Sequence, residues 1–142
     1  MDAKQFLRQV RHLDDLIDTK LEQIQELRSL AEKVTTAIGL DGTSPQSSVL
    51  QDKIGDLVSR IIDLQIEIET AARKMIDLKT ETMRIIDRMP TPECRLLLQL
   101  RYLNGLTWER IAVDMNYSYR NVHYLHSRAL QEFEAVRNKN IA

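Results

Sequence analysis

The chain has 142 residues, of which 43% are apolar and 29% charged, with only four Gly, three Pro and two Phe. Its many Leu, Ile, Glu, Gln, Lys and Arg residues, without strand-type alternation, predict an all-α protein of one ordinary domain or two small ones. The formal charge of −1 divides into −3 for residues 1–89 and +2 for residues 90–142. This small basic excess has the sign that nucleic-acid binding requires, but it argues against tight binding by a single copy.

Cysteine usage and hydropathy exclude several classes of protein. Cys94 is the only cysteine, so neither an internal disulfide nor a cysteine-based metal site can form. Near the start of a predicted helix, the pKa of its thiol would be lowered. The N-terminus lacks the apolar core of a signal peptide, and no stretch approaches the ~18 apolar residues of a membrane span. We expect a soluble, cytoplasmic protein that contacts no membrane and holds no metal or cofactor.

Residues 3–38 carry a heptad repeat. One apolar series falls seven residues apart, at Ala3, Val10, Ile17, Ile24, Ala31 and Ile38. The interleaved series comprises Phe6, Leu13, Leu27 and Val34, with Lys20 as the one polar exception. The pattern predicts one long coiled-coil helix. Lys20 either selects the register or oligomeric state, or extends to solvent without consequence.

A loop is predicted at Gly39–Ser48, where Ser47 or Ser48 would cap the next helix. The heptad pattern then resumes over Leu50–Met89. Its seam positions are Leu50, Ile54, Leu57, Ile61, Leu64, Ile68, Ala71, Met75, Leu78, Thr82, Ile85 and Met89. Further apolar residues lie off this seam, at Val58, Ile62, Ile66, Ala72, Ile76 and Ile86. We therefore predict that residues 1–89 form an antiparallel coiled-coil hairpin with a spare apolar face for a second copy or another protein.

The segment Pro90–Pro92 ends the second long helix, because proline removes a backbone N–H and restricts the preceding residue. Pro92 then suits the first position of a helix over Glu93–Leu103, which Asn104-Gly105 closes. The predicted apolar face of this helix comprises Leu96, Leu97, Leu100 and Leu103. We expect it to support a second domain, residues 90–142.

Two amphipathic helices follow, separated by a break at Asn116-Tyr117. Thr107 can cap the first helix and Ser118 the second. The first would bury Ile111, Ala112 and Met115, and the second Val122, Leu125, Ala129, Phe133 and Val136. Two short capped helices around a turn of this length predict a helix-turn-helix, whose second helix enters the DNA major groove.

The opposite face of the second helix carries side chains that can hydrogen-bond, and none of them is acidic. Its members are Arg120, Tyr124, Ser127 and Gln131, with His123 and Arg128 beside them and Tyr119 at the helix N-terminus. A helix built only for solvent would usually include Glu or Asp. For Arg120 we favour contact with a guanine or a phosphate over an ordinary solvated arginine, because bidentate pairing needs a planar fork on the exposed face.

Residues 91–136, about a third of the chain, resemble region 4 of bacterial sigma factors. The shared pattern includes the support helix, Leu100-Arg101-Tyr102, Leu106-Thr107, Ile111-Ala112 and Arg128-Ala129-Leu130. With the hairpin included, the chain is similar to small phage and prophage proteins of Gram-positive bacteria. These are sigma-like, or ArpU/RinA-type, regulators of late transcription.

The resemblance implies contacts with base edges from Tyr119, Arg120, His123 and Tyr124, and with phosphates from Thr107, Trp108, Ser118 and Arg128. Sigma factors usually place several Arg, a Glu and a Gln in this helix. This chain instead has Tyr119, Asn121, His123 and Tyr124 there, which puts recognition of a standard promoter −35 element in doubt. No sigma region for melting the start site is found, and the hairpin stands in its place.

Several of these residues have simpler structural interpretations. His123 and His126 lie three residues apart, but no third ligand is nearby and His126 points toward the core, which favours a structural histidine over a metal ligand. Trp108 can equally pack in a small core, and an exposed Tyr124 can cover an apolar neighbour. Without a phosphate loop, nucleophile motif or metal quartet in the sequence, we expect no enzyme activity and no small-molecule substrate.

The sequence thus predicts a DNA-binding phage or prophage regulator of transcription, a homodimer through its hairpin, that activates late genes with host RNA polymerase. Two alternatives stay open. A small terminase-like packaging protein also pairs a helix-turn-helix with an oligomerising hairpin, but forms rings of many copies. A protein-only interaction module would use the helix-turn-helix to bind RNA polymerase and never DNA.

Overall fold

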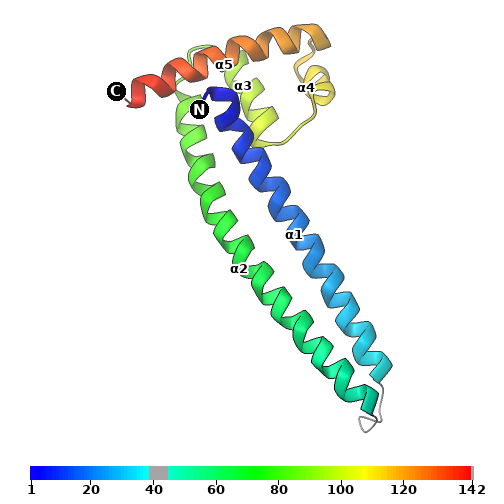
Figure 1. Ribbon diagram of the computed structural model, residues 1–142. Helices are drawn as coiled ribbons and strands as arrows, with labels where there is room; N and C mark the ends of the chain where they lie inside the picture. The colour runs from blue at the N-terminus through cyan, green and yellow to red at the C-terminus, as the bar shows by residue number, and fades with distance from the viewer. Residues whose placement is uncertain (39–44, 142) are drawn as a thin grey trace. The chain divides into compact units, whose positions relative to one another are not determined.

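The computed structural model describes residues 1–38 and 45–141, and the described residues are predominantly helical. Helices α1 (Ala3–Ile38) and α2 (Pro45–Asp87) form a long antiparallel hairpin (Figure 1). The C-terminal part comprises α3 (Pro92–Leu98), a π-helical segment η1 (Gln99–Leu103), α4 (Trp108–Met115) and α5 (Tyr119–Ile141). The predicted fold class, a helical hairpin followed by a helix-turn-helix, is confirmed.

The heptad seam accounts for the buried strip of each hairpin helix. Every predicted seam position is buried or half-buried, apart from Ile38, whose side chain lies outside those described. Helix α1 has the predicted bounds and begins with a reciprocal cap. The Gln5 N–H donates to Asp2 Oδ1 at 2.8 Å, and the Asp2 N–H donates to Gln5 Oε1 at 3.0 Å. This pair satisfies two N–H groups that the helix start leaves unpaired.

The start of α2 corrects the predicted loop. Because the helix begins at Pro45, Ser47 and Ser48 lie inside its first turns and are not N-caps. Proline suits the first helical position, since its φ is already helical and it lacks the N–H that would be unpaired there. The remainder of the predicted loop, residues 39–44, lies outside the described residues.

Lys20, the polar residue of the seam, forms an ion pair between the two hairpin helices. Its Nζ lies 2.6 Å from Glu67 Oε2. This hydrogen bond lowers the pKa of the Glu67 carboxyl. An exposed pair contributes little to stability. Because it joins one turn of α1 to one turn of α2, the pair is the contact through which Lys20 would select the register, and that role stays a prediction.

The chain divides into two compact units: residues 1–14 with 74–142, and residues 15–73. We call them the head unit and the stem unit. The head unit contains 14 Lys and Arg against 10 Asp and Glu, a charge of +4, and the stem unit contains 6 against 11, a charge of −5. The charge separation is therefore larger between these units than between residues 1–89 and 90–142. The domain boundary expected at residues 89 and 90 stays a prediction.

The core of the head unit joins the first turns of α1 and the last turns of α2 to the C-terminal helices. The rings of Phe6 and Phe133 lie 5.9 Å apart between centroids. Around them are buried Leu7, Ile85, Ile86, Met89, Leu97, Leu98, Ile111, Val122 and Ala129. The helix-turn-helix is thus fixed to a core that includes the N-terminal turns of the chain.

The predicted support helix changes from α to π geometry partway along. The Asn104 N–H donates to Gln99 O at 2.9 Å, five residues back. The buried face of α3 is centred on Cys94, Leu97 and Leu98, whereas Leu96 is 44% exposed, so its predicted burial is wrong. The predicted apolar face assumed α-helical spacing along the whole helix. A π helix has more residues per turn, so the buried positions shift within η1, and Tyr102 lies inside the core.

Candidate nucleic-acid interface

Helices α4 and α5 begin at the caps that the sequence predicts. Thr107 Oγ1 accepts a hydrogen bond from the Arg110 N–H at 3.2 Å. Ser118 Oγ accepts one from the Asn121 N–H at 3.1 Å. Each cap satisfies an N–H of a first helical turn, where the backbone supplies no acceptor.

The turn between the helices is tight because Asn116 adopts a left-handed conformation, with φ 57° and ψ 42°. The Asn116 N–H donates to Val113 O at 3.1 Å, and the Tyr117 N–H donates to Ala112 O at 3.0 Å. This is the hydrogen-bond pattern of a Schellman C-cap, and asparagine is among the few non-glycine residues that tolerate the conformation. The predicted break at Asn116-Tyr117 is therefore a specific turn.

Packing fixes which face of α5 remains accessible. Val122, Ala129 and Phe133 are fully buried, and they meet the fully buried Ile111 of α4 in one core. Ala112, Met115, Leu125 and Val136 are partly buried against the same core. The predicted apolar stripe of α5 thus faces inward, and the polar stripe faces away from the core.

The accessible face of α5, which we call the reading face, comprises Tyr119, Arg120, Tyr124, Ser127, Arg128 and Gln131, all exposed. Tyr124 is 77% exposed and Tyr119 51% exposed. Among the described residues, Arg120 and Tyr124 have no hydrogen-bond or ion-pair partner. Ser127 Oγ donates to His123 O at 3.4 Å. Two free polar side chains on a packed helix are available for a ligand.

An aromatic cluster joins the start of α4 to the start of α5. The His123 ring lies 5.0 Å from Trp108 and 4.5 Å from Tyr119 between centroids. The Arg101 guanidinium lies 4.4 Å above the Trp108 ring. His123 Nε2 is buried without a partner among the described residues. The predicted base contact by His123 therefore cannot use Nε2 in this conformation, whereas Tyr119 extends from the same cluster to the surface.

His126 lies on the inner side of this cluster. It is buried, its ring is 4.5 Å from that of Trp108, and its Nε2 lies 2.8 Å from Tyr102 Oη. Burial, followed by the positive charge of Lys4, lowers the pKa of His126 to about 4. The neutral ring shares a buried hydrogen bond with Tyr102, whose donor is set by the tautomer of the ring, as expected for a structural histidine. Within residues 1–38 and 45–141, no three His, Cys, Asp or Glu side chains come together to hold a metal ion.

Comparison with known families agrees with this geometry. Residues 80–133 match the family model described as Sigma-70, region 4. This segment is a Sigma-70 region 4 domain. It runs from the last turns of α2 to Phe133 and contains both helices of the helix-turn-helix. No curated protein and no solved structure gives a significant match.

A region 4 helix-turn-helix implies DNA binding and a role in transcription, and such domains are typically non-enzymatic. In this domain the predicted contact residues lie at the two helix starts and along α5. Thr107 and Trp108 are at the start of α4, Ser118 and Tyr119 at the start of α5, and Arg120, Tyr124, Ser127 and Arg128 follow. None of the helices in the described parts of the chain combines the length and hydropathy needed to cross a bilayer.

Arg101 and Tyr102 contribute to the region 4 domain but were not among the predicted site residues. Arg101 Nη1 donates to Leu106 O at 2.9 Å and so holds the loop before α4. The sequence did indicate that these two residues matter, because Leu100-Arg101-Tyr102 is part of the pattern shared with region 4. What the sequence did not reveal is that η1 directs one side chain toward Trp108 and the other toward His126.

Cys94 corrects a second expectation. The thiol is fully buried, and burial, followed by a hydrogen bond to Glu132, raises its pKa to about 12. The position near the start of α3 does not lower the pKa, because desolvation of the thiolate outweighs the helix dipole. Cys94 is therefore an apolar core residue of the region 4 domain.

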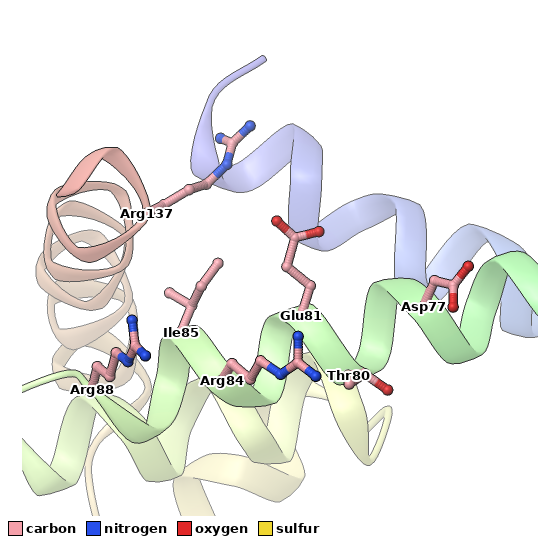
Figure 2. Close-up of a pocket in the computed structure, with 7 residues that line it drawn as sticks. All are labelled: Asp77, Thr80, Glu81, Arg84, Ile85, Arg88 and Arg137. Carbon is pink, nitrogen blue, oxygen red and sulfur yellow. The ribbon is translucent and has the colours of Figure 1, made fainter. Parts of the chain in front are cut away.

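A polar pocket lies near the C-terminal end of α2. Figure 2 shows Arg137 reaching from α5 toward it, while the other lining residues, Asp77, Thr80, Glu81, Arg84, Ile85 and Arg88, come from α2. Arg137 Nη1 donates to Met1 O at 2.8 Å and lies 3.6 Å from Glu134 Oε1. The lining charges are mixed, and Arg137 already holds the chain terminus. We assign this pocket no ligand.

Proposed function

We propose that this protein is a sequence-specific DNA-binding regulator of transcription whose α5 lies in the major groove. The observation that carries the proposal is the reading face, where Arg120 and Tyr124 are exposed and have no described partner. An arginine fork pairs with guanine O6 and N7, and tyrosine can hydrogen-bond or stack at a groove wall. The absence of acidic side chains from this face suits the negative potential of DNA.

The predicted contacts divide into those that position the domain and those that select sequence. Thr107, Trp108, Ser118 and Arg128 contact phosphates, which fix orientation without reading sequence. Arg120, Tyr124, Tyr119 and Ser127 face the bases. His123 is assigned a supporting role, because its ring lies between Trp108 and Tyr119 and its Nε2 is buried.

We further propose that the regulated genes are phage or prophage genes and that the protein activates them together with host RNA polymerase. Two observations support this. Residues 80–133 match the Sigma-70 region 4 family model, and the sequence pattern with its two heptad helices is the one for which we expect an ArpU/RinA-type regulator of late phage transcription.

Association through the hairpin is part of the same proposal. Val58, Ile62 and Ile66 lie four residues apart on α2, are 46–57% exposed, and fall outside the seam with α1. A second copy covers this apolar strip and brings two region 4 domains together. Two linked domains raise the effective concentration of each on DNA, which compensates for a modest charge per copy. Mass measurement in solution tests this: a dimer supports it, and a ring of many copies supports a terminase-like packaging protein instead.

DNA binding is tested with the purified full chain, duplex fragments of the genome that flank its gene, and random duplexes as competitor, over a salt series. We expect one or more fragments to bind at least about a thousandfold more tightly than random DNA. Arg120→Ala removes one bidentate contact, so it should cost that fragment about 1–3 kcal/mol and relax its selectivity.

Arg73→Ala is the matched control, because Arg73 is an exposed arginine of the stem unit that bonds only Glu69 among the described residues. It should leave affinity and selectivity unchanged. If the wild-type protein binds no duplex even at low salt, the proposal is wrong for the isolated protein, and RNA polymerase becomes the partner to test.

A further inference from the structure

The first turns of α1 carry a cluster of cations within the head unit. Lys4 and Arg8 lie one helical turn apart and are exposed, and neither has a hydrogen-bond or ion-pair partner among the described residues. Arg11 follows one turn later. The nearest acid in sequence, Asp2, is engaged in capping through its Oδ1. We call Lys4 and Arg8 the basic strip, because both face solvent on the first turns of α1.

This strip is held rigidly on the C-terminal helices. Arg137 of α5 bonds Met1 O and its guanidinium lies 4.8 Å above the Phe6 ring, which itself packs on Phe133. On the other side of these turns, Ala3, Phe6 and Leu7 are buried in the common core. Lys4 and Arg8 thus belong to the same body as α5, and their positions relative to it are fixed by packing.

Arg11, the next residue along this side of α1, lies beside the loop that leads into α4. The Arg11 guanidinium fills the space next to Gly105, whose φ is +74°, so that a Cβ there would collide with it. Arg101 bonds the next residue, Leu106, and covers Trp108 at the start of α4. After burial, the positive charges of Lys4, Arg101 and Arg8 contribute to the lowered pKa of His126, so these side chains lie near that ring.

We propose that Lys4 and Arg8 contact DNA phosphates and extend the interface of the region 4 domain beyond the two helix starts. This rests on the proposed DNA binding. Duplex DNA carries a negative charge for about every 1.7 Å of its axis, so a backbone that passes the start of α4 continues past neighbouring cations. The head unit has a charge of +4, compared with +2 for residues 90–142, and residues 1–14 and 74–89 each contribute +1 of this difference.

The test uses the full-length Lys4→Gln/Arg8→Gln variant. Each phosphate contact contributes about 0.9 to the slope of log affinity against log salt, so the slope should become shallower by about 1.8. At about 0.1 M salt the affinity should fall roughly 10- to 100-fold. Specific and random duplexes should lose affinity equally, because phosphates carry no sequence information. Lys4→Glu/Arg8→Glu should weaken both further.

Arg28→Gln/Lys33→Gln is the matched control, since these exposed residues of α1 lie in the stem unit and the variant removes the same charge. Its salt slope should equal that of the wild type. If the Lys4→Gln/Arg8→Gln slope also equals that of the wild type while DNA binding persists, the inference is overturned and the proposed function stands. If the wild-type protein binds no duplex, both this inference and the proposed function are wrong.

Discussion

The head and stem units are both helical, but they are stabilised in different ways. In the stem unit two helices share one seam, and among its described residues only Ile24, Leu64 and Ala71 are hydrophobic and buried. In the head unit several helices meet, and side chains such as Phe133, Ile111 and Leu97 are fully buried. Two helices can cover only a strip of each other, whereas a multi-helix core surrounds a side chain. The unit that resembles a DNA-binding domain is therefore also the better-packed and more basic one.

The largest effect is expected from the core of the head unit. Phe133→Ala removes a fully buried ring that contacts Phe6, so it should lower the free energy of unfolding by about 3–5 kcal/mol. Tyr124→Ala, on the same helix but 77% exposed, should change it by less than about 0.5 kcal/mol. Urea denaturation of both variants measures the difference. Equal costs for the two would show that the head unit lacks the core described above.

A pH titration of stability compares a buried histidine of the head unit, His126, with an exposed one. In the folded protein its pKa is about 4, and in the unfolded chain it is about 6.5, so folding favours the neutral ring. The stabilisation is complete above pH 6.5 and is lost as the pH falls toward 4, by up to about 3 kcal/mol. His126→Gln, whose amide can still hydrogen-bond Tyr102 but does not titrate, should remove this part of the pH dependence.

His12→Gln serves as the control, because His12 is exposed on α1. Its free energy of unfolding should follow the wild-type pH curve between pH 7 and pH 4. A curve for His126→Gln that still parallels the wild type would mean that another group causes the acid destabilisation.

The smallest effect is expected in the stem unit, at Lys20. Lys20→Leu restores an apolar seam position, and the ion pair that it removes with Glu67 is exposed. We expect the melting temperature to rise by a few degrees, with looser register or mixed oligomers, because a polar seam residue gives up stability for specificity. Lys33→Leu, outside the seam, is the control. A lower melting temperature for Lys20→Leu would show that the ion pair stabilises the hairpin more than seam packing would.

Local patterns were sufficient to predict most of the helices. The heptad repeat gave the bounds of α1 and the buried positions of the hairpin, because a seam of two helices is specified by spacing alone. Thr107, Ser118 and Asn116 predicted the two helix starts and the turn between them, because caps act over three or four residues.

Features that depend on distant residues could not be predicted in this way. No local signal indicates that Phe6 packs on Phe133, and so the N-terminal turns were not expected in the same body as α5. The π segment at Gln99–Leu103 and the raised pKa of Cys94 likewise follow from tertiary packing. At the candidate site, helix spacing placed the reading face on the surface, but the cluster of Trp108, His123 and Tyr119 joins separate elements and became visible only in the structure.

Methylation interference on the best-bound duplex tests most directly whether α5 reads the major groove. Methyl groups on guanine N7 project into that groove, where the Arg120 fork pairs with O6 and N7. We expect methylation of one or more guanines to abolish binding by the wild-type protein, and the interference at one of them to disappear with Arg120→Ala while it persists with Arg73→Ala. Interference confined to adenine N3, in the minor groove, or the same pattern for wild type and Arg120→Ala, would contradict the account.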